Sequence, residues 1–206
     1  MPPWEKGEQD TPSARARPNL DRLQPWIDQG AKVLALNATC SMIMRREYPE
    51  LLEGEGRARA KVLSEHIMDA SEYLWSLRKK ERLNTDFSSS PGDTVSGHAP
   101  CHLRAQAVGF RGRYLMCKIP GVKTMMVMEC CGHDGTWAMT VEGFDSSQEV
   151  RRTAFDGMKK VFAESGATDC PLAAIQFEQH AGVKSMHPMP VLARAYREDG
   201  FETEDK

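Results

Sequence analysis

Residues 124–137 read Thr-Met-Met-Val-Met-Glu-Cys-Cys-Gly-His-Asp-Gly-Thr-Trp, an apolar run that leads directly into two adjacent cysteines and a glycine. Adjacent cysteines bond to each other only under strain, so Cys130 and Cys131 suggest two thiolates directed at one metal centre. Gly132 allows a tight turn and a close approach of the backbone. The alternative is that the two cysteines are inert, and the pair alone does not distinguish this from a metal site.

The composition limits the class of protein. The chain has 206 residues, enough for one domain with a buried core, and a formal net charge of -2. This mixed charge predicts no nucleic-acid partner. No apolar stretch has the length of a transmembrane segment or the pattern of a signal peptide. We therefore expect a soluble, cytoplasmic protein, and docking at the inner membrane through a partner stays open.

The cysteines are expected to be reduced thiols. There are six: Cys40, Cys101, Cys117, Cys130, Cys131 and Cys170. Without a secretion signal they argue against a disulfide framework, and no C-x-x-C spacing predicts a zinc finger. The phosphate-binding motifs G-x-G-x-x-G and G-x-x-x-x-G-K-[ST] are also missing. Thiols of this kind are free for metal binding or redox chemistry.

Hydrophobic periodicity predicts an α/β fold with a mainly parallel sheet flanked by helices. The first part should contain a disordered tail over 1–18, a helix over 19–29, a strand over 32–36, a helix over 41–52, a long amphipathic helix over 57–83 and a loop over 84–93. The second part should contain strands over 94–98 and 122–128, helices over 102–117, 143–165, 173–180 and 189–197, and a frayed end over 199–206. Residues 166–169 are a short link and only a weak candidate for a strand.

The cysteines follow the predicted strands. Cys40, Cys101 and the Cys130–Cys131 pair each come just after one, and Cys170 comes after the link 166–169. Ligands of open α/β sheets bind beyond the carboxyl ends of the strands, so these cysteine loops are expected to converge there. Cys117, inside a predicted helix, is expected to be a plain buried thiol.

Three segments resemble the cysteine-rich CCG domain: residues 98–104 (HAPCHLR), 129–137 (ECCGHDGTW) and 169–173 (DCPLA). The domain occurs in a family of iron–sulfur proteins that includes the B subunit of heterodisulfide reductase and the C subunit of anaerobic glycerol-3-phosphate dehydrogenase. The resemblance covers residues 19–197. It implies that an iron–sulfur cluster, expected to be of the 4Fe-4S type, is held by Cys101, Cys130, Cys131 and Cys170.

Residues beside these ligand positions have two interpretations each. His102, His133 and Asp134 are candidates to donate hydrogen bonds to the ligands, or are ordinary loop residues. Arg104 either offsets thiolate charge or is simply exposed.

The chain departs from the family pattern in two ways. Ala173 stands where a full CCG motif has its last cysteine, which puts a fifth thiolate in doubt. By the resemblance, residues 19–90 are the remnant of a first CCG repeat and residues 91–198 are the CCG domain. We expect the N-terminal ferredoxin module and most of the first repeat to be missing. Cys40 is then a relic, or it completes a site with another chain.

The resemblance favours an iron–sulfur electron-transfer subunit. It would relay electrons from a flavin-containing dehydrogenase subunit, acting on glycerol 3-phosphate or a 2-hydroxy acid, to an acceptor such as membrane quinone. Because no phosphate loop or catalytic base is visible, the chain is expected to be an oxidoreductase component, and cleavage of a disulfide by the cluster is a variant. The alternative is a non-redox interaction module, or half of a split protein, with the cluster site empty or filled by zinc.

Overall fold

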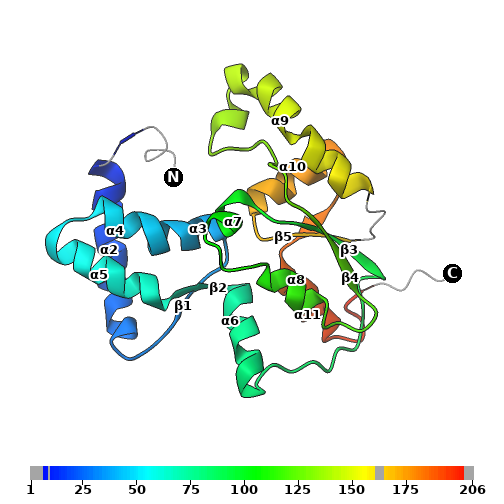
Figure 1. Cartoon of the computed structure of the whole chain (residues 1–206), viewed down its shortest axis with the longest axis horizontal. Coiled ribbons are helices and arrows are strands. Elements are labelled where there is room, and N and C mark those ends of the chain that lie inside the picture. Colours follow the sequence, from blue (N-terminus) through cyan, green and yellow to red (C-terminus); the bar gives the residue numbers. More distant parts are fainter. Residues whose placement is uncertain (1–6, 9, 161–164, 202–206) are drawn as a thin grey trace. The chain divides into compact units, whose positions relative to one another are not determined.

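The structure, a computed structural model, describes residues 7–8, 10–160 and 165–201 (Figure 1). The chain forms two compact units: a first unit of residues 1–70 with 134–136, and a second unit of residues 71–133 with 137–206. Helices and parallel strands alternate along the chain, which confirms the predicted α/β class. The strands form two sheets, with orders β1-β2 and β4-β3-β5-β6. The assignment of residues 19–90 and 91–198 to two CCG repeats stays a prediction.

The first unit surrounds a two-stranded parallel sheet with helices. Strand β1 (Val33–Ala35) pairs with β2 (Ile67–Asp69), Val33 lying opposite Ile67. The helical segments are α2 (Asp10–Ile27), α3 (Ala38–Met42), a π-helical turn (Ile43–Glu47), α4 (Tyr48–Leu51) and α5 (Gly54–His66). Their apolar sides enclose a core that includes Leu20, Leu52 and Leu63.

Two predictions for the first unit are wrong. The tail expected over 1–18 is helical from Asp10 onward, because Ala16 and Leu20 are buried and tie this polar segment to the core. The single helix expected over 57–83 is broken into α5 and α6 (Ala70–Leu77) by strand β2. Pairing with β1 stabilises β2 more than the local helix propensity stabilises a continuous helix.

The second unit is built on a four-stranded parallel sheet. Its strands are β3 (Thr94–His98), β4 (Lys123–Val127), β5 (Ser165–Thr168) and β6 (Ser185–Met186). The predicted strands over 94–98 and 122–128 are confirmed. The weak candidate near 166–169 is β5, which lies beside β3 inside the sheet. A Cβ atom at Gly166 would lie 2.4 Å from Ser185 Oγ, so close strand approach favours small residues here and weakens the hydrophobic signal.

Helices cover both faces of this sheet (Figure 1). Helices α8 (Arg111–Met116) and α11 (Pro188–Ala195) pack on one face, in a cluster with Val95. Helices α9 (Val141–Lys160) and α10 (Pro171–Ala181) pack on the other, in a cluster with Val127 and Phe177. The short helix α7 (Cys101–Ala105) follows β3 directly. No helix in the described ranges is long and apolar enough to cross a membrane.

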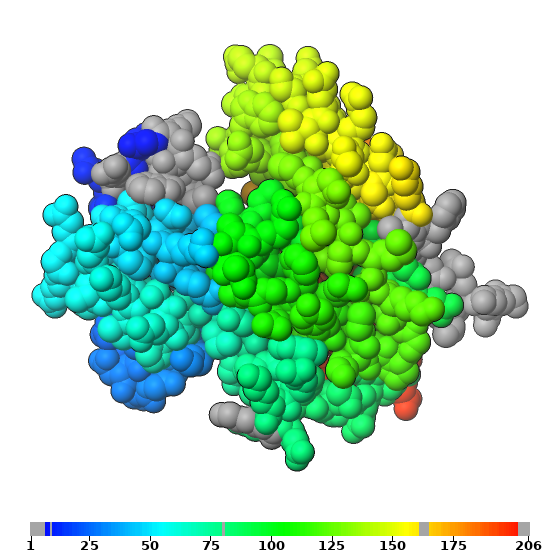
Figure 2. Space-filling view, in the orientation of Figure 1, coloured from blue at the N-terminus to red at the C-terminus, as the bar shows by residue number. Residues whose placement is uncertain are grey.

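The helices of the second unit also differ from prediction. The helix expected over 102–117 is divided into α7 and α8, with Ala107 and Gly109 at positive φ between them. The buried side of α9 consists of Gly143, Ser147, Arg151, Ala154, Phe155 and Met158, whereas Val150, expected on that side, is exposed. Figure 2 shows the outer side of α9, in yellow-green and yellow, at the molecular surface. Residues 161–164, part of the predicted helix over 143–165, lie outside the described residues, as do 202–206 of the predicted frayed end.

Candidate cysteine cluster site

Four cysteines lie just beyond the carboxyl ends of three neighbouring strands. Cys101 follows β3, Cys130 and Cys131 follow β4, and Cys170 follows β5. Since β4, β3 and β5 are adjacent and parallel, the three loops meet at one edge of the sheet. The thiols of Cys101 and Cys130 share a hydrogen bond, and the charge on Cys101 acts on both Cys131 and Cys170. The structure thus brings the four predicted ligand residues together.

The other two cysteines lie elsewhere. Cys40 is exposed in α3 of the first unit. Cys117 is exposed as well, with its Sγ 3.2 Å from Thr124 Oγ1. The prediction that Cys117 is buried inside a helix is wrong, because α8 ends at Met116 and Cys117 is its C-cap.

The Cys101–Cys130 hydrogen bond makes these two thiols unequal. It lowers the pKa of Cys101 to about 5, and the neighbouring side chains of Arg104 and His102 act in the same direction. The Arg104 Nη2 atom lies 3.7 Å from Cys101 Sγ. The same hydrogen bond, together with burial, raises the pKa of Cys130, although the backbone N–H of Gly132 donates to its sulfur at 3.3 Å. At neutral pH, Cys101 is therefore the thiolate and Cys130 keeps the proton.

Cys131 and Cys170 are partly exposed thiols whose pKa values are set mainly by burial. Burial raises the pKa of Cys131 to about 11 and also raises that of Cys170. Both pack against the apolar cluster that contains Ala173 and Phe177. Backbone N–H groups oppose the rise: His133 acts on Cys131, and the first turn of α10 acts on Cys170. Thiols in such surroundings ionise when a metal ion binds them.

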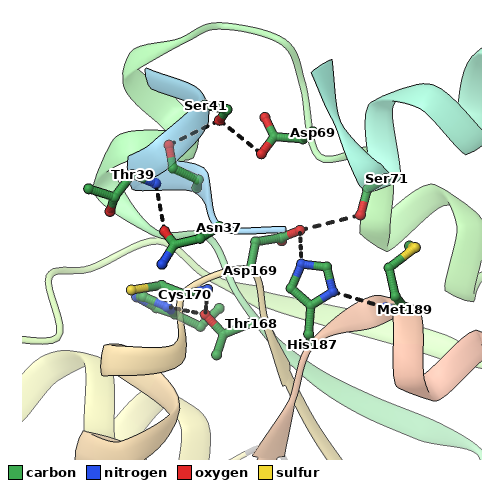
Figure 3. A network of polar contacts seen from close by, with 12 residues as sticks. Asn37, Thr39, Ser41, Asp69, Ser71, Thr168, Asp169, Cys170, His187 and Met189 are labelled. Atoms are coloured by element: carbon green, nitrogen blue, oxygen red, sulfur yellow. Dashed lines mark hydrogen bonds and ion pairs between the residues drawn. The ribbon is translucent and has the colours of Figure 1, made fainter. Parts of the chain in front are cut away.

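His98 ties the three cysteine loops together. It is the last residue of β3 and is 2% exposed. Its Nε2 lies 3.1 Å from the Glu129 carbonyl oxygen and its Nδ1 lies 3.1 Å from Thr168 Oγ1. A carbonyl only accepts, so Nε2–H donates to Glu129 and the Thr168 hydroxyl donates to Nδ1. Thr168 Oγ1 in turn accepts from the Cys170 N–H at 3.3 Å (Figure 3). Burial lowers the pKa of His98 to about 4, which keeps the ring neutral.

The loop before Cys170 has a second support, shown in Figure 3. The Ser71 hydroxyl donates to Asp169 Oδ1 at 3.3 Å, and His187 Nε2 lies 3.7 Å from the same oxygen. The His187 Nδ1 accepts from the Met189 N–H at 3.1 Å, and burial lowers the pKa of His187. These contacts fix the backbone at Asp169, directly before Cys170.

Gly132 allows the tight turn and close backbone approach that its position after the cysteines predicts. Its φ is +72°, a conformation that favours glycine, and a Cβ atom there would lie 2.6 Å from the Ser147 carbonyl oxygen. The Ser147 hydroxyl donates to the Gly132 carbonyl at 2.9 Å. The cysteine loop therefore lies directly against α9, where any side chain at position 132 would collide with the helix.

The residues beside the predicted ligands act on the thiols in different ways. Arg104 acts on Cys101 through a hydrogen bond and its charge, whereas His102 acts on Cys101 electrostatically. His133 acts on Cys131 through its backbone N–H. Hydrogen bonds from the side chains of the two histidines to the ligands stay a prediction. Asp134 has φ +40° and belongs to the first unit, so its role stays a prediction. Ala173 is fully buried, in the position of the missing cysteine.

Sequence reasoning missed His98, Thr168 and Ser147. The available signal was a polar residue at a buried position: His98 and Thr168 end their strands just before a cysteine, and Ser147 interrupts the apolar side of α9.

Comparisons with known proteins find similar proteins. No protein-family profile matches the chain, and no solved structure does. Two curated proteins, from Escherichia coli strain K12 and strain O157:H7, are each 28% identical to the chain over 191 residues, and each is named as the C subunit of anaerobic glycerol-3-phosphate dehydrogenase. This chain is similar to that subunit. The resemblance stated from the cysteine motifs is confirmed, over 92% of the chain, and the chain spans 47% of the length of these relatives.

Two kinds of metal centre differ in how their ligands are arranged. Within residues 7–8, 10–160 and 165–201, no three His, Cys, Asp or Glu side chains are placed to hold one metal ion. A zinc ion needs its ligand atoms within about 2.3 Å of one point. The cysteines of an iron–sulfur cluster bind different iron atoms and can lie further apart. The four cysteines come from three loops at one edge of the sheet, and the kind of metal centre that they would hold stays a prediction.

Proposed function

We propose that the chain is an iron–sulfur electron-transfer subunit with its cluster held by Cys101, Cys130, Cys131 and Cys170. The convergence of these four thiols at the end of the four-stranded sheet carries the proposal. Thiolates are the soft, anionic donors that iron–sulfur clusters use, and four of them suit a 4Fe-4S cluster. When bound, the cluster would accept and release single electrons.

The protein's own residues would keep the site rigid and balance its charge. His98 fixes the backbone before Cys130 and, through Thr168, the backbone at Cys170. Arg104 offsets negative charge at Cys101. The apolar cluster under Cys131 and Cys170 excludes water from one side of the site. Rigid ligands, nearby donors and partial burial are the features by which proteins set the potential of a cluster.

Substrate chemistry would belong to a partner. We propose a flavin-containing dehydrogenase subunit as the electron donor, oxidising glycerol 3-phosphate or a 2-hydroxy acid, and quinone as the acceptor. The name of the two relatives supports the first of these substrates. The chain would then act in the cytoplasm, at the surface of the inner membrane where quinone is reached through a further subunit.

A second candidate is a non-redox module, or half of a split protein, in which the cysteine site is empty or holds zinc. The observation that favours an empty site is that, among the described residues, no three His, Cys, Asp or Glu side chains are placed to hold one metal ion.

Replacement of single cysteines tests the proposal against this alternative. After anaerobic reconstitution with iron and sulfide, Cys131→Ser should lose most of the iron and the visible absorption. Cys117→Ser, which removes a thiol outside the site, should keep both. Equal iron content in the two variants, or zinc in place of iron in the purified wild type, would contradict the proposal.

A further inference from the structure

Arg151 is a buried cation on α9, the helix against which the cysteine loop lies at Gly132. It lies on the inner side of α9 and is 2% exposed, among the largest fully buried side chains. Its Nη1 donates a hydrogen bond to Gln176 Oε1 on α10. Its Nη2 is buried and has no hydrogen-bond partner in the described part of the chain. The guanidinium carbon lies 4.9 Å from the ring centre of Phe155 and 5.8 Å from that of Phe144.

Such surroundings compensate the charge only in part. A guanidinium stays protonated in proteins, and its removal from water is unfavourable unless it is paired. Two aromatic rings and one neutral amide offset part of this cost. The ion pairs that the described residues form do not include Arg151. The unsatisfied Nη2 therefore points to an anion that the carboxylates of the described residues do not supply.

Arg151 stands directly behind the cysteine loop. A Cβ atom at Gly132 would lie 3.0 Å from the Arg151 Cβ, and Ser147, one helical turn earlier on α9, donates to the Gly132 carbonyl. The side of α9 that carries Arg151 is thus the side on which the loop rests.

A chain of polar side chains also connects Arg151 to this loop. Because arginine only donates, the Gln176 atom that it meets is the carbonyl oxygen, and the Gln176 NH2 group faces His133 Nδ1 at 3.3 Å. The backbone N–H of His133 acts on the sulfur of Cys131. Gln176 therefore links the guanidinium of Arg151 to His133, the residue that follows the cysteine pair and Gly132.

We propose that Arg151 is the buried counter-charge of the cysteine site, which stabilises negative charge there and raises the reduction potential of the cluster. This inference rests on the proposed function. Four thiolates give a cluster site net negative charge, and each added electron increases it, so a fixed positive charge favours the reduced state. An arginine that served only to join α9 to α10 would have no such effect on the potential.

The test compares three variants of the reconstituted protein. Arg151→Met removes the charge and keeps a long side chain, and Arg151→Lys keeps the charge. Arg152→Met is the matched control, because Arg152 is the next residue on α9 and is exposed. The midpoint potential is measured by redox titration of the visible and EPR signals, at matched iron and sulfide content.

The expected result is that Arg151→Met makes reduction about tenfold less favourable, which is about 59 mV for a one-electron couple. Arg151→Lys should recover most of this shift, and Arg152→Met should show the wild-type potential. Loss of the cluster in Arg151→Met but not in Arg151→Lys would also support the counter-charge.

An unchanged potential in Arg151→Met would overturn the inference, as would loss of the cluster in both Arg151 variants, because shape rather than charge would then be the requirement. A wild-type protein without iron and sulfide would overturn the proposed function itself, and the counter-charge with it.

Discussion

At the scale of single residues, the hydrogen bond between Cys101 and Cys130 determines which thiol reacts first. In the metal-free protein, Cys101 should be alkylated fastest at pH 6 to 7, since its pKa is lowered to about 5 and its side chain is exposed. Cys130→Ala removes the largest cause of that shift and should slow alkylation of Cys101 at pH 6 by about tenfold. Iodoacetamide labelling followed by mass spectrometry measures the rates. Cys117→Ala should leave the alkylation rate of Cys101 unchanged. An equal alkylation rate of Cys101 in Cys130→Ala and in the wild type would refute this account of the pair.

His98 should make stability depend on pH. Its pKa is about 4 in the folded chain against 6.5 for the ordinary side chain, so below pH 6.5 the unfolded chain binds a proton that the folded chain resists. The stabilisation by neutral His98 is complete above pH 6.5 and is lost as the pH falls toward 4, by up to about 3 kcal/mol. Urea unfolding between pH 7 and 4 should show this fall. His98→Gln should be less stable than the wild type at pH 7 and should lose less stability on acidification. If the free energy of unfolding changed with pH in the same way in both proteins, the role of the His98 ring would be disproved.

At the scale of elements, Gly132 tests the contact between the cysteine loop and α9. Gly132→Ala should destabilise the protein by at least about 3 kcal/mol, because it combines a positive φ with a Cβ atom 2.6 Å from Ser147 O. Gly121→Ala is a matched control: Gly121 has φ +81° and an added Cβ there would have no neighbouring atom within 4 Å, so only the backbone strain of about 1 kcal/mol remains. Chemical denaturation measures both. Equal losses of stability in Gly132→Ala and Gly121→Ala would mean that the cysteine loop is not tightly packed against α9.

The elements that the sequence predicts correctly are those with a strong local pattern. Strand β4 ends in the apolar run Met125–Val127, and β3, Thr-Val-Ser-Gly-His, begins with two β-branched residues and is followed by Ala-Pro. Both strands are where we expected them. Strand β5 has the sequence Ser-Gly-Ala-Thr, whose small residues suit close strand packing but give little hydrophobic signal. Strand β2 lies within a helical pattern, and only its pairing with β1, distant in the sequence, makes it a strand.

At the scale of the whole molecule, the position of the cysteine site was predictable, but the contacts that hold its loops in place were not. The alternation of strands and helices places Cys101, Cys130 and Cys170 at the carboxyl ends of strands, and parallel sheets bring such ends together. The sheet order β4-β3-β5-β6 puts β3 in the middle, which allows His98 to reach both Glu129 and Thr168. That order depends on long-range packing, so neither the His98 contacts nor the burial of Arg151 could be deduced from local patterns.

The proposed role as an electron carrier predicts dependence on a partner. The reconstituted protein alone should show no bleaching of its cluster when glycerol 3-phosphate is added, because the chain has no recognisable phosphate-binding motif. Addition of a flavin-containing glycerol-3-phosphate dehydrogenase should produce bleaching, followed by stopped-flow absorbance. Bleaching by glycerol 3-phosphate without the flavoprotein would show that this chain performs the substrate chemistry itself.

The central claim is that the four cysteines hold a redox-active cluster. The most direct measurement is an iron and acid-labile sulfide assay, with a visible spectrum, on protein purified and reconstituted without oxygen. A 4Fe-4S cluster predicts about four irons and four sulfides per chain and a broad absorption band that bleaches on reduction with dithionite. A folded, colourless protein that contains neither iron nor sulfide after reconstitution would contradict the account.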